Sequence, residues 1–308
     1  HVFVDPEGLM ENLVKVDAAM DKHFGEDNNP YPKVIRNRNR KYFHIDPDGN
    51  FWRLMEFVPD SMSYDIAESA QVAYEGAAAF GLFQRVMNSE RASDYIPTIP
   101  DFHHLGKRLL QLNDAITRDA FGRVAMARRE ITIALDRHEY ANELEELLRN
   151  KVVPMRVTHN DTKLNNVLFS KDTGKYICVV DLDTVMPGTV LYDYGDMVRT
   201  FTSPVEEDEP DPAKVIFREE IFEALTRGYL SQLKDNLVAG EKDNLLFGGK
   251  IMLLMIGVRF LTDFLEGDHY FKTSRENHNL ERCRNQFALL EQIENNEYAL
   301  KKIIHSCL

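Results

Sequence analysis

The sequence predicts an α+β fold of two lobes: a small N-terminal lobe that contains strands, and a larger C-terminal lobe that is mostly helical. A chain of 308 residues lies at the size where a single hydrophobic core stops growing, near 250 to 300 residues. Strand-like runs occur early in the chain, whereas helical patterning dominates after residue 65. The composition, 44% hydrophobic and 28% charged, is that of an ordinary globular protein.

The small lobe is predicted from one helix and one hairpin. Asp5 and Pro6 are typical of a helix start, and apolar residues follow at helical spacing as far as Phe24. Residues 41–45 and 51–58 are rich in aromatic and branched side chains and flank an Asp-Pro-Asp-Gly turn, which predicts a β-hairpin. We interpret residues 56–61 as a hinge. Residues 1–60 are then the first domain and residues 61–308 the second.

The large lobe is predicted to be mainly helical. Residues 65–88 are Ala-rich, and residues 105–150 contain almost no Gly or Pro. Short strand-like runs at 155–158 and 176–180 bracket a loop, and helical patterning returns after residue 212. The most apolar stretch, 251–265, has only 15 residues and includes two charges, so it falls short of the roughly 20 apolar residues of a membrane span. It predicts a buried core helix and no membrane partner.

Charge and cysteine content narrow the possible partners. Lys and Arg total 37 against 50 Asp and Glu, and a net charge of −13 argues against nucleic-acid binding. The acidic run 205–211 is more typical of a solvated loop than of a binding site. Three widely spaced cysteines suit a reducing compartment, and no export signal opens the sequence, so we expect a cytoplasmic protein. Nothing in the sequence indicates an oligomeric state.

The strongest chemical signal is the His-Asn-Asp-Thr-Lys-Leu-Asn-Asn run at 159–166, directly after a predicted strand. Phosphoryl transfer requires one carboxylate to orient an attacking hydroxyl and a nearby group to hold a metal ion that neutralises phosphate charge. Asp161 and Asn166, five residues apart across a tight loop, can have these two roles. The run therefore predicts Asp161 as the base and Asn166 as a metal ligand.

A second signal follows 15 residues later. Two valines at the end of a predicted strand lead into Asp181-Leu182-Asp183. Mg²⁺ bound to ATP needs only one or two protein carboxylates, and Asp181 is placed to supply the first. Asp183 is either a second metal contact, which we favour, or a hydrogen-bonding brace. The two signals in this order are more specific than either alone.

Together these runs resemble the catalytic loop and metal-binding strand of the aminoglycoside phosphotransferase and choline kinase superfamily, relatives of protein kinases. The resemblance implies a protein-kinase-like two-lobe fold that uses ATP and Mg²⁺. It implies a structural role for His159 and a brace on the catalytic loop at Asp193. Phe57 and Val58 lie where the hinge would bind adenine, and Lys163 is either a phosphate contact or a solvated lysine.

Within this superfamily the chain is most similar to the N-acetylhexosamine 1-kinases. The similarity is carried by the runs at 80–85, 101–103, 158–166, 181–188 and 258–263. It implies transfer of phosphate to the anomeric hydroxyl of N-acetylglucosamine or N-acetylgalactosamine.

The residues proposed to contact the acceptor are Arg259, Asp263 and His103. The alternative for Arg259 and Asp263 is a structural ion pair at helical spacing. The competing functions are a choline, amino-alcohol or aminoglycoside kinase and a catalytically silent nucleotide-binding protein.

One departure from the superfamily pattern concerns the small lobe. A kinase-like small lobe begins with strands that carry a phosphate-covering loop and a lysine or equivalent cation. The sequence opens at His1, just before the first predicted helix. We therefore expect a truncated small lobe.

Overall fold

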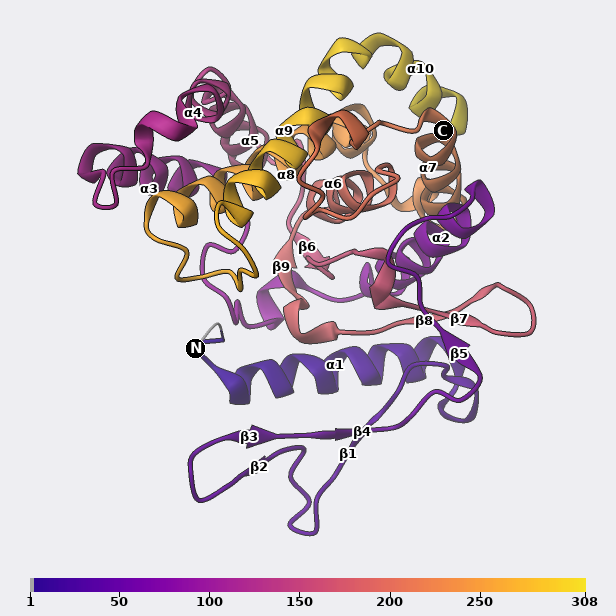
Figure 1. The fold of residues 1–308 in the computed structure, drawn as a ribbon. Coiled ribbons are helices and arrows are strands. Elements are labelled where there is room, and N and C mark those ends of the chain that lie inside the picture. The colour runs from indigo at the N-terminus through magenta and orange to yellow at the C-terminus, as the bar shows by residue number, and fades with distance from the viewer. Residues whose placement is uncertain (1–2) are drawn as a thin grey trace.

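The first helix, α1 (Pro6–Phe24), lies between the small hairpins and the rest of the molecule in the computed structural model, which describes residues 3–308 (Figure 1). Asp5 caps the helix, because its Oδ1 accepts a hydrogen bond from the Gly8 N–H at 2.8 Å. Buried Asn12 donates to the carbonyl oxygens of Ile96 and Val185, at 2.8 and 3.0 Å. The predicted helix is confirmed, and Asn12 joins it to the segment that follows Asp181.

The strands of the small lobe are shorter than predicted. β2 (His44–Ile45) and β3 (Phe51–Trp52) form the expected antiparallel hairpin. The Asp46 carboxylate fixes its turn, since it accepts hydrogen bonds from Asp48, Asn50 and the Trp52 indole. After Trp52 the chain changes partner, and β4 (Leu54–Met55) pairs with β1 (Val34–Ile35), a strand that the sequence pattern did not predict.

Two further sheets surround the predicted catalytic loop. β6 (Arg156–Thr158) pairs with β9 (Met186–Gly188), and β5 (Ser61–Met62), β7 (Val167–Ser170) and β8 (Tyr176–Val179) form a three-stranded sheet in the order β5-β7-β8. The strands predicted at 155–158 and 176–180 are confirmed. They belong to different sheets, because β6 pairs with β9 whereas β8 pairs with β7, a strand that the sequence did not predict.

The remaining helices form most of the large lobe (Figure 1). They are α2 (Ala70–Met87), α3 (Leu105–Arg118), α4 (Arg128–Leu135), α5 (Glu139–Arg149), α6 (Val190–Phe201), α7 (Glu219–Leu233), α8 (Ala239–Leu265), α9 (His278–Asn295) and α10 (Glu297–Cys307). Helix α8 is long and apolar enough to cross a membrane, but 89% of its most apolar window is buried inside the protein. It is the core helix that the sequence predicts.

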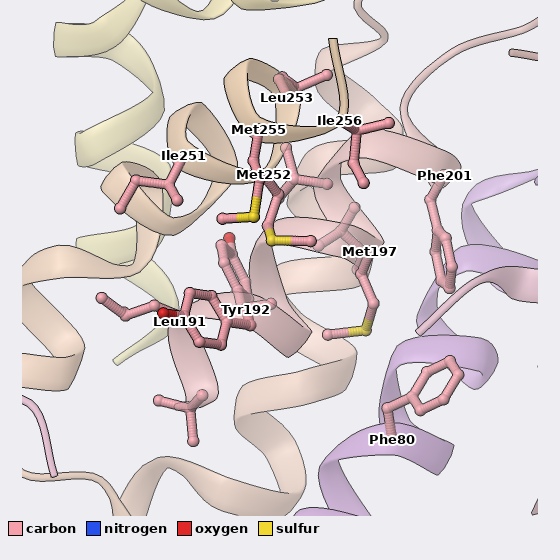
Figure 2. Packing of buried hydrophobic residues seen from close by; sticks show 14 of the residues in the cluster. Phe80, Leu191, Tyr192, Met197, Phe201, Ile251, Met252, Leu253, Met255 and Ile256 are labelled. Carbon is pink, nitrogen blue, oxygen red and sulfur yellow. The ribbon is translucent and has the colours of Figure 1, made fainter. Parts of the chain in front are cut away.

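Helices α6 and α8 cross at two glycines. A Cβ atom on Gly195 would lie 2.2 Å from the Gly248 carbonyl oxygen, and one on Gly248 would lie 2.4 Å from the Leu191 carbonyl oxygen. Figure 2 shows the buried side chains of both helices around this region, with Phe80 of α2 nearby. The close approach fixes the position of α6 against α8, and both helices contribute side chains to the site described next.

Candidate active site

The loop after β6 turns sharply at Asn160. This residue has a φ of 63°, in the left-handed region that asparagine tolerates better than most side chains. Its amide nitrogen donates to the carbonyl oxygens of Thr158 and Thr184, at 3.1 and 3.0 Å. These bonds hold the turn against the segment before β9. Asp161 follows directly and lines a cavity.

Two buried side chains hold this loop from behind. Asp193 on α6 accepts hydrogen bonds from the N–H groups of His159 and Asn160, at 2.9 and 2.7 Å. His159 donates through Nε2 to the Val180 carbonyl oxygen at 3.0 Å, and its Nδ1 accepts from the Asp161 N–H at 3.3 Å. Burial lowers the pKa of His159, which favours this neutral form. Both ring nitrogens are therefore occupied within the protein.

The Asp161 carboxylate lies between an amide and an ammonium group. The Asn166 amide nitrogen donates to the Asp161 Oδ2 at 3.1 Å, and Lys163 Nζ lies 3.1 Å from Oδ1. Burial lowers the pKa of Lys163, but the nearby Asp161 and Asp196 carboxylates raise it more, so the lysine stays charged. Lys163 is thus part of an ion pair beside the cavity. The amide oxygen of Asn166 makes no hydrogen bond within the described part of the chain.

Asp181 follows β8 and has a φ of 59°. Burial raises its pKa, and the neighbouring Asp183 and Asp161 carboxylates raise it further. Neighbouring carboxylates repel one another, and a cation bound between them would relieve the repulsion. The free amide oxygen of Asn166 and the carboxylate of Asp181 are the hard oxygen donors that Mg²⁺ prefers, so the residues present fit this metal.

Asp183 has a partner that the sequence did not predict. Arg53, next to the hairpin, reaches its carboxylate with an Nη2 to Oδ1 distance of 2.6 Å. Within residues 3–308 no three His, Cys, Asp or Glu side chains surround one metal position. A metal bound here would therefore take most of its ligands from water and phosphate, as Mg²⁺ in nucleotide sites does.

A cavity of about 250 Å³ opens beside Asp161. Its charged lining is balanced, with three acidic and three basic side chains: Asp161, Asp196, Glu207, Lys163, Arg199 and Arg259. His103 also lines it, and its Nε2 donates to the Asn160 carbonyl oxygen at 2.9 Å. Burial lowers the pKa of His103 to about 4, so the ring is neutral at pH 7. His103 Nδ1 and Asp196 Oδ2 are buried acceptors with no donor among the described residues.

Arg259 on α8 is surrounded by aromatic rings. Its guanidinium carbon lies 5.3 Å from the ring centre of Phe102, 5.6 Å from that of Tyr270 and 5.4 Å from that of Phe271. Its Nη2 also donates to the Tyr270 hydroxyl at 3.3 Å. This is a cation–π arrangement in which the protein supplies the cation.

Asp263 does not pair with Arg259. Its Oδ1 accepts from the backbone N–H groups of His269 and Tyr270, at 2.9 and 2.8 Å, and its Oδ2 accepts from the Phe271 N–H at 2.9 Å. The structural ion pair considered for Arg259 and Asp263 is therefore absent from the described structure. Asp263 lies outside the Asp161 cavity, and it holds the loop that carries two of the aromatic rings around Arg259.

The acidic run contributes to the site through Glu207. Arg199 on α6 is buried and donates to Asp196 Oδ1 at 2.7 Å and to Glu207 Oε2 at 2.8 Å. Glu207 is exposed, as expected for a solvated loop, but it also lines the cavity through its contact with Arg199. A buried arginine needs carboxylate partners, and the spacing of Asp196 and Arg199 on one helix face was the available signal in the sequence.

The expected adenine contacts lie on the segment that joins β4 to β5. Phe57 is 86% exposed, and Val58 is half-buried. The Val58 carbonyl oxygen accepts a hydrogen bond from the Ser61 hydroxyl at 2.8 Å.

The fold, the carboxylate at the cavity and the adjacent cluster of oxygen donors define a small-molecule kinase. A model of the phosphotransferase enzyme family (APH) matches residues 10–232, and the chain belongs to this family.

Solved structures of kinases share the fold. An aminoglycoside phosphotransferase from Alicyclobacillus acidocaldarius is 10% identical with a TM-score of 0.61, over 98% of this chain and 84% of that one. A choline kinase from Cryptosporidium parvum is 16% identical with a TM-score of 0.57, over 96% and 81%. The amicoumacin kinase hAmiN, in complex with AMP-PNP and Ca²⁺, is 12% identical with a TM-score of 0.56, over 93% and 78%. The kinase-like α+β fold is thus confirmed, and family membership implies the use of ATP.

Proposed function

We propose that this kinase transfers the γ-phosphoryl group of ATP to a hydroxyl of a neutral, polyhydroxylated acceptor, namely the anomeric hydroxyl of an N-acetylhexosamine. The observation that carries the proposal is the position of Arg259. Aromatic faces that would surround a quaternary ammonium group already surround the protein's own guanidinium. A second cation in the same place would be repelled.

The chemistry requires little covalent participation by the protein. Asp161 accepts the proton of the acceptor hydroxyl as its oxygen attacks the γ-phosphorus, and ADP leaves on the opposite side. Lys163, which pairs with Asp161, is the proposed contact to the transferred phosphoryl group. Asn166 and Asp181 would hold Mg²⁺, with Asp183 as a further contact, and the bound metal neutralises charge on the phosphates. Phe57 and Val58 are the proposed adenine contacts.

The cavity beside Asp161 suits an acceptor that donates hydrogen bonds. His103 Nδ1 and Asp196 Oδ2 are buried acceptors without donors, and an unsatisfied buried acceptor is costly. Sugar hydroxyl groups and an acetamido N–H can donate to them, whereas a trimethylammonium group cannot. Each carboxylate that lines the cavity already has a basic partner, Lys163 for Asp161 and Arg199 for both Asp196 and Glu207, so none is free to bind the ammonium groups of an aminoglycoside.

A catalytically silent protein and an amino-alcohol kinase are also weaker alternatives. A silent protein would need no intact set of catalytic groups, yet Asp161, Asn166 and Asp181 come together at the cavity and its adjacent donor cluster. An amino-alcohol kinase would need a site for an ammonium group, and Arg259 fills the aromatic site present here.

The test is a coupled assay of ADP release over a panel of acceptors. N-acetylglucosamine or N-acetylgalactosamine should support turnover, the corresponding 1-deoxy sugar should not, and choline and ethanolamine should be inert. The 1-deoxy sugar lacks the hydroxyl whose oxygen attacks the γ-phosphorus, so it cannot be phosphorylated at the anomeric position. Turnover of choline with inert hexosamines would refute the proposal. The variant Arg259→Ala should lose hexosamine turnover and, with its aromatic site vacated, gain measurable choline binding.

A further inference from the structure

A second cavity of about 290 Å³ adjoins the cavity beside Asp161. The two share Arg259, Tyr270 and Phe271 as lining residues, so Arg259 stands between them. The second cavity is otherwise lined by side chains of α3, of α8 and of the residues just after α8, namely Arg108, Gln111, Asp114, Arg118, Thr262, Asp263 and Glu266. A substituent on an acceptor bound at Asp161 could extend past Arg259 into this space.

Three of the six charged side chains that line the second cavity have strong partners. Arg118 forms an ion pair with Glu266, and Asp263 accepts the hydrogen bonds of the loop described above. Asp114 is exposed, and its backbone carbonyl oxygen accepts a hydrogen bond from Arg118 Nε at 3.4 Å, whereas its carboxylate has no basic partner within 4.0 Å in residues 3–308. The guanidinium groups of Arg108 and Arg259 have no carboxylate partner within 4.0 Å in residues 3–308.

Arg108 has only neutral partners. It donates to the Gln111 amide oxygen at 3.0 Å and to the carbonyl oxygens of Asp101 and Phe102, both at 3.3 Å. Its Nε is buried and has no acceptor among the described residues. Arg259 likewise has no carboxylate within 4.0 Å in this part of the chain, and its one hydrogen-bond partner is the Tyr270 hydroxyl. Burial lowers the pKa of Arg108, and the positive charge of Arg259 lowers it further.

This arrangement is unusual in a chain with net charge −13, where carboxylates are in excess. Two neighbouring arginines have no carboxylate within 4.0 Å among residues 3–308, and one of them has a buried N–H that lacks an acceptor, so a bound oxyanion would supply the counter-charge that these groups lack. We propose that the second cavity binds an oxyanion, such as a carboxylate or a sulfate ester, carried by the acceptor away from the hydroxyl that is phosphorylated. This inference rests on the proposed function, because it assumes that the acceptor hydroxyl lies at Asp161.

The test is equilibrium binding without nucleotide. N-acetylglucosamine and its 3-, 4- and 6-O-sulfate esters are titrated into the protein by calorimetry. At least one ester should bind about tenfold or more tightly than the neutral sugar, as expected for hydrogen bonds to a charged group, and the gain should shrink as salt is added. Equal or weaker binding of all three esters would overturn the inference.

Two variants assign the effect to Arg108. Arg108→Gln should remove the preference for the ester. Gln111→Glu should remove it as well, because the new carboxylate lies beside the Arg108 Nη1 and neutralises it; Gln111 is exposed, so this variant tests the idea even if Arg108→Gln fails to fold. Lys107→Gln, next to Arg108 on α3 and paired with Asp101 outside the cavity, should keep the preference. A preference that survives both Arg108→Gln and Gln111→Glu would also overturn the assignment.

The outcome separates this inference from the proposed function. If hexosamines bind and are phosphorylated but sulfate esters bind no better, only the second cavity has been misassigned. If no hexosamine is phosphorylated while a sulfate ester binds through Arg108, the oxyanion site stands and the acceptor class is wrong.

Discussion

Replacing Asp263 with Asn tests how the acceptor side of the site is held. The two Asp263 oxygens accept four hydrogen bonds, three from consecutive backbone N–H groups and one from the Asn279 amide. Asn keeps the shape but turns one oxygen into an NH₂ group, which faces two donors. A hydrogen bond to a charged group contributes about 1.5 to 3 kcal/mol. The loop is partly exposed, so water replaces some of the lost hydrogen bonding, and we expect the free energy of unfolding to fall by about 3 kcal/mol.

The expected consequence is a looser loop around Arg259 with an intact fold. If acceptor binding weakens by about 1.4 kcal/mol of this free energy, the acceptor KM rises about tenfold, while the KM for ATP stays unchanged. Steady-state assays of ADP release and thermal unfolding measure the two effects. Lys107→Gln, which removes an exposed ion pair with Asp101 outside both cavities, is the control and should change neither KM. An unchanged acceptor KM in a folded Asp263→Asn protein would refute the role given to this carboxylate.

Four further predictions follow from the same geometry. Asp161→Asn should lower kcat by about 10² to 10⁴ and leave ATP binding intact by calorimetry, and retained turnover would exclude it as the base. Asn166→Ala should move the Mg²⁺ dependence to higher concentration, and an unchanged titration would contradict a ligand role. Gly248→Ala should lower stability by about 1 to 3 kcal/mol in chemical denaturation, because its Cβ meets the Leu191 carbonyl oxygen at 2.4 Å, whereas Gly249→Ala, whose Cβ first meets a Val198 side-chain carbon at 3.2 Å, should cost less. Burial lowers the pKa of His103 from 6.5 to about 4, so the unfolded chain takes up a proton first as pH falls. The contribution of neutral His103 to the free energy of unfolding is complete above pH 6.5, and about 3 kcal/mol of it is lost by pH 4. This loss should be absent in His103→Gln.

The elements that the sequence predicted correctly are those specified by local chemistry. Asp5 and Pro6 begin α1 because capping and proline geometry act within one turn. The Asp46 turn closes the hairpin through bonds to residues two to six positions away. The catalytic loop is similar, since a separation of five positions between Asp161 and Asn166 suffices to bring their side chains into contact.

The features that the sequence did not predict depend on distant partners. β1 pairs with β4 across about twenty residues, and two-residue strands carry no readable alternation. The role of Asp263 depends on a loop beyond the end of its helix, and helical spacing suggested Arg259 instead. Glu207 looked like one more charge in an acidic run, and only the buried Arg199 beneath it distinguishes it from its neighbours.

The two halves of the site are placed by different helices that share one crossing. Helix α6 carries Asp193, which holds the catalytic loop, and α8 ends at the loop that Asp263 holds around Arg259. Because Gly195 and Gly248 fix how α6 meets α8, the distance between the phosphoryl-transfer groups and the acceptor loop is set within the core. Substitutions at Tyr270 or Phe271 can therefore change which acceptor fits without moving Asp161.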